Sequence, residues 1–162
     1  MTTEPTVTDR QAQDYVAIKR TVTMTSIADI ADRIPDLFVW LGQRDIPPAG
    51  APFLKYNVID MERELEIEAG VPIGAPVEGS GEIFAGVLPA GRYATVKHVG
   101  HPDDLLQVTG DLLGWAHGHD LEFDRHDSPA GDVWRCRLEF YHSNPAEVPI
   151  DKWETELAFL LR

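Results

Sequence analysis

An internal repeat constrains this chain more than any other feature of its sequence. Residues 15–19 (YVAIK) resemble residues 93–97 (YATVK), and residues 36–40 (DLFVW) resemble residues 111–115 (DLLGW). Three more pairs match in the same order: Asp45-Ile46 with Asp120-Leu121, Tyr56 with Tyr141, and residues 68–73 with 156–161. The spacing between the copies changes from 78 residues to 75 and then to 85 and 88, as differences in loop length require. Two copies of one unit predict two similar halves related by a pseudo-two-fold axis.

Each copy has the pattern strand, helix, strand, strand. Alternating apolar and polar residues predict the strands, and apolar residues at helical spacing predict one helix in each copy. Pro35 lies inside the first helical pattern and predicts a kink there. The expected strands cover residues 15–24, 53–59, 65–71, 83–88, 92–99, 134–142 and 153–161, and the expected helices cover 26–42 and 102–117, with a connector at 74–81 and a loop at 124–132.

This order of elements predicts an α+β fold. One copy is too short to bury its own sheet well, so we expect the two copies to pack together. The expected architecture is a duplicated β-α-β-β unit with pseudo-two-fold symmetry, in which antiparallel sheets carry two helices on one side and a ligand groove on the other. A single domain over residues 14–162 is expected, with halves at about 14–80 and 81–162. Residues 1–13 are polar and without period, which is typical of a flexible tail.

Composition excludes several classes of partner. The net charge of −13 argues against binding to nucleic acid or to an anionic membrane, both of which require basic surfaces. No apolar run is long enough to span a bilayer, and the N-terminus has no signal-peptide pattern. The single cysteine, Cys136, excludes an internal disulfide and is typical of a reducing compartment. We therefore expect a cytoplasmic protein.

The strand expected at residues 134–142 carries an unusual carboxylate. Alternation places Arg135, Arg137, Glu139 and Tyr141 on one face, and Trp134, Cys136, Leu138, Phe140 and His142 on the other. Glu139 either lies on solvated sheet surface, pairs with Arg135 or Arg137 in a structural ion pair, or faces an enclosed site. The same alternation separates Trp134 from Glu139 unless a bulge interrupts the strand.

The repeat favours the enclosed site. When Tyr56 is matched to Tyr141, Leu54 takes the place of Glu139 in the first copy. The fold therefore tolerates an aliphatic residue at this position, so Glu139 is not a structural requirement. Tyr56 and Tyr141 are then candidate aromatic walls beside a groove, although ordinary cross-strand tyrosines remain an alternative.

The remaining candidates are weaker. Phe38 and Trp40 in the first helix and Trp115 in the second are either groove-closing aromatics or core residues. His117, His119 and His126 lack any established metal-ligand spacing, so we expect no metal site. No phosphate loop or nucleophile elbow is present, and Cys136 has no evident base. No cofactor is expected.

Four motifs in one order resemble a known family. They are residues 65–73 (LEIEAGVPI), 88–100 (LPAGRYATVKHVG), 138–145 (LEFYHSNP) and 153–157 (WETEL). They resemble the GyrI-like small-molecule-binding domain, which also forms the effector-binding part of AraC-type and MerR-type regulators. The resemblance covers about residues 10–162 and implies a ligand channel between two β-α-β-β halves. It also implies that Glu139 contacts the ligand, typically a bulky aromatic cation. This chain departs from the regulators in having only a short tail before Tyr15, so we expect a stand-alone member without a DNA-binding domain.

Three functions follow as hypotheses. The first is a binding module for hydrophobic, often cationic aromatic molecules, with Glu139 as counter-charge and with Tyr141, Tyr56, Leu54 and Arg137 beside it. The second is a hydrolase of cyclopropane-bearing toxins that uses Glu139 as general base, as the resemblance implies for some stand-alone members. The third is a protein-interaction module, such as an inhibitor that docks its acidic surface on a basic DNA enzyme. The binding module is favoured because no catalytic dyad is evident.

Overall fold

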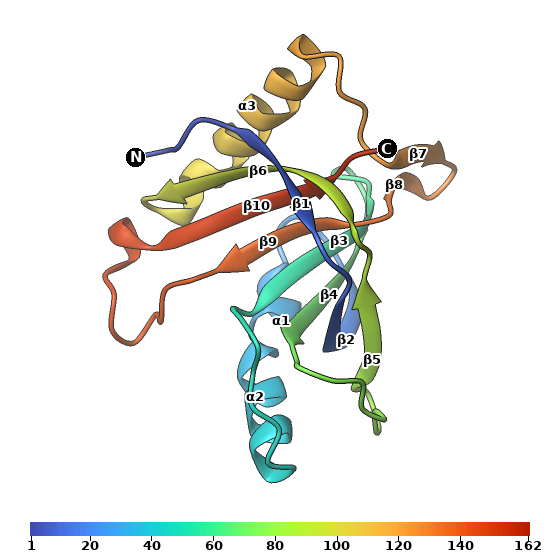
Figure 1. The fold of residues 1–162 in the computed structure, drawn as a ribbon, viewed down its shortest axis with the longest axis vertical. Helices are drawn as coiled ribbons and strands as arrows, with labels where there is room; N and C mark the ends of the chain where they lie inside the picture. The colour runs from blue at the N-terminus through green and yellow to red at the C-terminus, as the bar shows by residue number, and fades with distance from the viewer.

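The computed structural model describes all 162 residues and contains the predicted repeat (Figure 1). The first copy consists of β1 (Thr6–Arg10), β2 (Gln13–Val22), α1 (Ala28–Ala31), α2 (Ile34–Gln43), β3 (Phe53–Ile59) and β4 (Leu65–Pro72). The second consists of β5 (Phe84–Leu88), β6 (Gly91–Val99), η1 (Pro102–Asp104), α3 (Leu105–Gly118), β7 (Arg125–Ser128), β8 (Gly131–Trp134), β9 (Arg137–Tyr141), η2 (Ile150–Lys152) and β10 (Glu154–Leu160). None of the helices is long and apolar enough to cross a membrane.

The strands form one curled antiparallel sheet, and its centre lies between the two copies. The order is β1-β6-β10-β9-β3-β4-β2-β5, with β7 and β8 attached as a hairpin beside β3. At the centre, β3 and β9 pair in a register that places Leu54 directly opposite Glu139. These are the two positions that the repeat makes equivalent, so the pseudo-two-fold axis passes through this pair. The predicted α+β class and duplicated architecture are confirmed.

The repeat extends to the backbone at the helix ends. Asp45 after α2 and Asp120 after α3 have φ values of 54° and 56°, the only positive values outside glycine. In each case the next residue donates its N–H back into the helix, over 3.0 Å, from Ile46 to the Leu41 carbonyl and from Leu121 to the Ala116 carbonyl. Aspartate tolerates the left-handed conformation better than most residues, which explains why both copies keep it.

The prediction of a flexible tail over residues 1–13 is wrong, because this segment contains β1. β1 pairs with β6 of the second copy, with Thr6 opposite Thr95. Its counterpart 78 residues later, β5, pairs with β2 of the first copy, with Phe84 opposite Ala17. The two registers are equivalent under the repeat. Each copy therefore contributes an N-terminal arm that fastens onto the other copy.

Removal of residues 1–10 should lower the free energy of unfolding by about 2 kcal/mol or more. The truncation removes the β1–β6 ladder and the ion pair between Arg10 and Glu156 (2.7 Å), and it exposes the edge of β6. Urea denaturation followed by tryptophan fluorescence measures the effect. As a control, Glu4→Ala changes an exposed residue before the strand and should shift the free energy by less than about 0.5 kcal/mol. An unchanged urea midpoint in the truncated chain would mean that the arm carries no stability.

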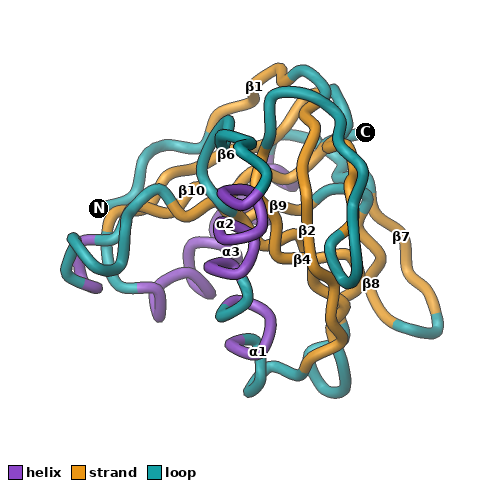
Figure 2. Tube along the Cα trace, turned by 90° about the horizontal axis from the view of Figure 1, so that it is seen from below, coloured by secondary structure: helices purple, strands orange, loops and turns teal.

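The two faces of the sheet have separate cores. The helix-bearing face packs against Leu37 and Leu41 of α2 and against Val108 and Leu112 of α3. The core of the opposite face contains no helical residue and includes Tyr15, Phe53, Tyr93 and Phe140, among others. Figure 2 shows the helices gathered on one side of the strands. α2 packs mainly on β4 and β2, and α3 on β6, so the central strands β10, β9 and β3 lie between the two helices (Figure 1).

Two further segments differ from the sequence prediction. The expected kinked helix 26–42 is two helices, because α1 ends at Ala31 and α2 begins at Ile34, which places Pro35 in the first turn, where no N–H is needed. The loop expected at 124–132 is the hairpin β7–β8 instead. This hairpin has no counterpart in the first copy, which explains the larger spacing between the repeats downstream of it.

Candidate functional site

Glu139 lies at the pseudo-two-fold axis on the helix-bearing face. Its neighbours in register, Leu54 and Leu157, belong to the core of that face. The Tyr141 hydroxyl donates to Glu139 Oε1 over 2.6 Å, and the Tyr56 hydroxyl donates to Oε2 over 3.3 Å. The axis thus brings the two equivalent tyrosines to one carboxylate. We call Glu139, Tyr56, Tyr141 and Arg137 the Glu139 cluster.

The environment of Glu139 disfavours its charge. Burial raises the pKa of Glu139, while the two tyrosine hydrogen bonds and the charge of Arg137 act in the opposite direction. Burial and the Glu139 charge also raise the pKa of Tyr141 and of Tyr56 well above the usual value of a tyrosine. Both hydroxyls therefore stay protonated and act as donors at neutral pH. The tyrosine hydrogen bonds and the charge of Arg137 therefore do not fully offset the cost of burying the Glu139 carboxylate.

Neither candidate arginine forms an ion pair with Glu139. Arg135 points away and pairs with Asp124 (3.3 Å). Arg137 has no carboxylate within ion-pair distance; its guanidinium lies over the rings of Trp134 and Phe159, 4.7 Å from each centroid, and 5.8 Å from that of Tyr56. Burial lowers the pKa of Arg137. The alternative that Glu139 serves as half of a structural ion pair is therefore wrong.

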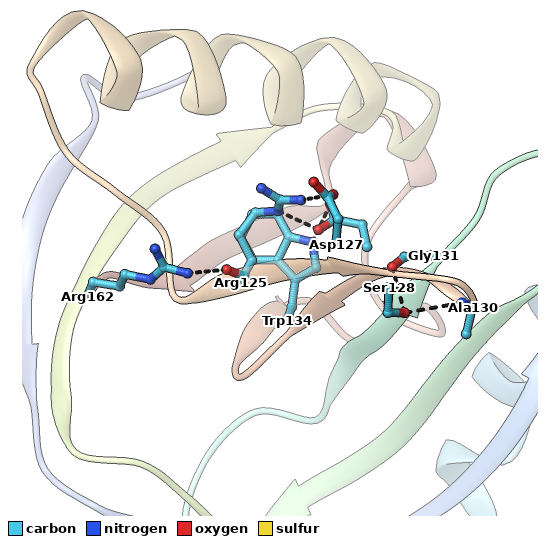
Figure 3. A network of polar contacts seen from close by, with 8 residues as sticks. Arg125, Asp127, Ser128, Ala130, Gly131, Trp134 and Arg162 are labelled. Carbon is cyan, nitrogen blue, oxygen red and sulfur yellow. Dashed lines mark hydrogen bonds and ion pairs between the residues drawn. The ribbon is translucent and has the colours of Figure 1, made fainter.

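Trp134 lies on the same face as Glu139, contrary to the alternation of a regular strand. β8 ends at Trp134 and β9 begins at Arg137. Because Arg135 and Cys136 interrupt the strand, the regular alternation of side chains between the two faces is broken, and Trp134 lies on the helix-bearing face. The β7–β8 hairpin, which Figure 3 shows with Trp134 beside Arg125 and Asp127, fixes the indole. The indole N–H donates to Asp132 over 2.8 Å. Arg125 binds Asp127 and Asp132 in the same network. Trp134 is consequently a neighbour of Arg137 in the core of the helix-bearing face.

The other predicted aromatics are more dispersed. Leu54 is buried beside Glu139. The Trp40 indole N–H donates to Ser80 over 3.0 Å and Arg44 stacks on its ring at 4.0 Å, so its polar atom is used within the first copy. Phe38 is exposed on α2. Trp115 is partly buried and packs on the core of the helix-bearing face, where its ring contacts His119.

A pocket of about 410 Å³ lies on the opposite, helix-free face. The predicted groove on the side away from the helices therefore exists, but Glu139, Tyr56 and Tyr141 do not line it. Its polar side chains include Arg10, His142 and Glu156, which the sequence reasoning missed as candidates. The repeat offered one signal for them, since it pairs Glu156 with Glu68 on equivalent strands.

The fold and the cluster define a duplicated α+β domain with a carboxylate at its symmetry axis. The chain belongs to the GyrI-like small molecule binding domain family, whose model matches residues 3–162. No match was found among curated proteins. The domain is therefore a small-molecule-binding domain.

Solved structures share the fold at low sequence identity. A cryo-EM structure of EcmrR in complex with DNA has a TM-score of 0.78 at 16% identity; the match covers 98% of this chain but 57% of that one. The isolated EcmrR C-terminal domain gives 0.72 at 15%, covering 98% and 97% of the two chains. SAV2435 bound to tetraphenylphosphonium gives 0.65 at 15%, covering 99% and 94%. A hydrolase from Listeria innocua gives 0.64 at 10%, covering 98% and 92%.

Proposed function

We propose that the protein binds bulky aromatic cations on the helix-bearing face, with Glu139 as counter-charge. One observation carries the proposal: the Glu139 carboxylate lies at the axis between the two helices, accepts hydrogen bonds from two tyrosines, and has no basic partner within ion-pair distance. A carboxylate in such a place is stabilised when a cation approaches it. Ligand binding and the ionisation of Glu139 are therefore coupled.

The aromatic residues around Glu139 suit the same ligand. Tyr56 and Tyr141 lie on either side of the axis, and a ring face attracts a cation with about 0.5–2 kcal/mol. The two tyrosines are already oriented by their hydrogen bonds to Glu139, so little order is lost when a ligand binds. SAV2435 bound to tetraphenylphosphonium supports this ligand class, because that protein shares the fold and binds a bulky aromatic cation.

Fluorescence titration with rhodamine 6G tests the proposal. We expect saturable binding at one site and displacement of the dye by tetraphenylphosphonium. A neutral aromatic dye of similar size is the matched control and should bind more weakly, because it gains nothing from Glu139. The absence of saturable rhodamine 6G binding at millimolar protein would refute the proposal.

Cation binding should strengthen as pH rises toward neutral. The raised pKa of Glu139 means that the carboxyl group is still protonated at pH values where an ordinary glutamate is ionised, and the protonated form cannot balance a cation. The sign is opposite for folding: ionisation of this group as pH rises through the folded-state pKa lowers the free energy of unfolding. Isothermal titration calorimetry with tetraphenylphosphonium across the acidic-to-neutral range measures the first effect.

The control for the pH effect is Glu139→Gln, in which the affinity should no longer rise with pH. The two tyrosines do not contribute, because their pKa values lie well above this range. An equal rise in the wild-type protein and in Glu139→Gln would assign the pH dependence to another group.

A hydrolase is the second candidate, because the structure removes one objection to it. Trp134 and Glu139 lie on one face, and the raised pKa of Glu139 suits a general base. In such a reaction Glu139 would accept a proton from water, and the water oxygen would attack the strained carbon as a ring bond breaks; the electron pair of that bond would pass into an electron-withdrawing group of the toxin, which would then take up the proton from Glu139. Incubation with a cyclopropane-bearing alkylator, followed by mass spectrometry, tests this. Multiple turnovers that Glu139→Gln abolishes would support it, and product formation that the substitution leaves unchanged would exclude Glu139 as the base.

A further inference from the structure

The helix-free pocket has a different chemistry from the Glu139 cluster. Its apolar wall includes the rings of Tyr93 and Phe140 and the side chains of Leu88 and Leu138. Its volume of about 410 Å³ falls within the range of about 300–1,000 Å³ that is usual for small-molecule sites. A planar hydrophobic group is the natural occupant of such a wall.

Among the charged groups of the pocket, the carboxylate acceptors of Glu156 are already used, whereas donors of the Arg10 guanidinium are free. Glu156 uses both carboxylate oxygens: Oε2 accepts from Arg10 Nη2 over 2.7 Å, and Oε1 lies 3.1 Å from His142 Nε2. The Arg10 guanidinium forms no other hydrogen bond, so its Nε and Nη1 donors remain available. A guanidinium presents its donors as a planar fork that matches a carboxylate.

Arg10 is also held in place by the aromatic wall. Its guanidinium lies 5.7 Å from the Tyr93 ring centroid and 5.6 Å from that of Phe140, and the His142 ring stacks on Phe140 at 6.2 Å. Burial acts to raise the pKa of Glu156, but His142 and Arg10 outweigh it and keep that pKa below its usual range. The ion pair is thus intact at neutral pH, and the fork is presented in a fixed position.

The repeat shows that the fold does not require this pocket. The equivalent carboxylate in the first copy, Glu68, is 5% exposed and accepts from Tyr15 (2.6 Å), Asn57 (2.7 Å) and Lys55 (3.3 Å). Lys55 stands where the second copy has Phe140. In the first copy, polar side chains therefore cover the carboxylate of Glu68. In the second copy, the equivalent Glu156 lines a pocket with an aromatic wall.

We propose that the helix-free pocket is a second binding site, and that it takes an aromatic carboxylate whose ring packs against the apolar lining of the pocket, which includes Ala51 and Pro89, and whose anion binds Arg10. The two faces of the sheet then select ligands of opposite charge. Arg10 belongs to β1, the N-terminal strand of the first copy, which pairs with β6 of the second copy. An anion bound to Arg10 therefore also holds β1 in place. The proposal is independent of the proposed cation site.

Titration of the whole protein with 2-naphthoate tests this site, with 2-naphthalenemethanol as the neutral control of similar shape. Binding followed by calorimetry should be saturable, and the neutral control should bind at least fivefold more weakly. Arg10→Gln and Ala51→Leu should each weaken 2-naphthoate binding at least fivefold, the first by removing the fork and the second by filling the pocket. Ala51→Leu leaves β1 untouched, so it distinguishes a lost site from a loosened arm.

Glu139→Gln distinguishes this site from the cation site, and it should leave 2-naphthoate affinity unchanged within twofold. Hydrogen exchange of the β1 amides should slow when 2-naphthoate is bound. Absence of saturable binding in the wild-type protein would overturn the proposal. Unchanged affinity in Arg10→Gln or Ala51→Leu, or loss of affinity in Glu139→Gln, would overturn it as well.

Discussion

Glu139→Gln should weaken the binding of tetraphenylphosphonium by roughly 10- to 100-fold, because two opposite unit charges about 6 Å apart attract by about 3 kcal/mol at an effective dielectric constant of about 20, and 1.4 kcal/mol is about tenfold in affinity. The substitution keeps the shape of the side chain: the amide oxygen can accept from Tyr141, and the amide N–H can donate to the Tyr56 hydroxyl oxygen. Isothermal titration calorimetry at constant ionic strength measures the change.

Stability should not fall with the affinity. The wild-type carboxylate is destabilised by burial, so the free energy of unfolding of Glu139→Gln should stay within about 1 kcal/mol of the wild type or increase. The matched control is Glu147→Gln, which makes the same change in net charge at an exposed loop position. Equal loss of affinity in both variants would mean that the overall negative charge, and not Glu139, attracts the cation.

Phe53→Ala should lower the free energy of unfolding by about 3–5 kcal/mol, the range for loss of a buried phenylalanine. Phe53 is fully buried on the helix-free face, and its ring contacts Tyr15 and Phe140 with centroid distances of 5.3 and 5.5 Å. It also lies directly over Gly70, where a Cβ would be 2.4 Å from Phe53 Cζ. The small residue opposite makes room for the ring, and nothing else is placed to fill the space it would leave.

Chemical denaturation measures this loss, with Phe38→Ala as the control. Phe38 is 37% exposed on α2, so its truncation removes the same atoms at a much smaller cost, about 1 kcal/mol or less. If Phe53→Ala lost less than 2 kcal/mol, the helix-free core would have to be looser than its contacts indicate.

The sequence predicted the architecture because the duplication is visible in its residues. Alternation and helical spacing place β2, β3, β4, β6 and both main helices within a few residues. The equivalence of Leu54 and Glu139, inferred from the matched tyrosines, corresponds to the register at the centre of the sheet. These features depend on local pattern, which a single sequence contains.

Features that depend on distant partners were missed. β1 is polar and mostly exposed, and it is a strand only because β6 offers a free edge to pair with. The interruption at Arg135 and Cys136, which brings Trp134 to the face of Glu139, depends on the hairpin β7–β8 and its ion pairs. The helix-free pocket is assembled from both arms and both copies, including Arg10, Pro72 and Glu156, so no local segment of the sequence indicates it.

A crystal structure of the tetraphenylphosphonium complex is the most direct test of Glu139 as the counter-charge of a bound cation. We expect the phosphonium on the helix-bearing face between α2 and α3, with its positive centre facing Glu139 and its rings against Tyr56 and Tyr141. A phosphonium bound in the helix-free pocket, or anywhere without contact to Glu139, would contradict this role of Glu139.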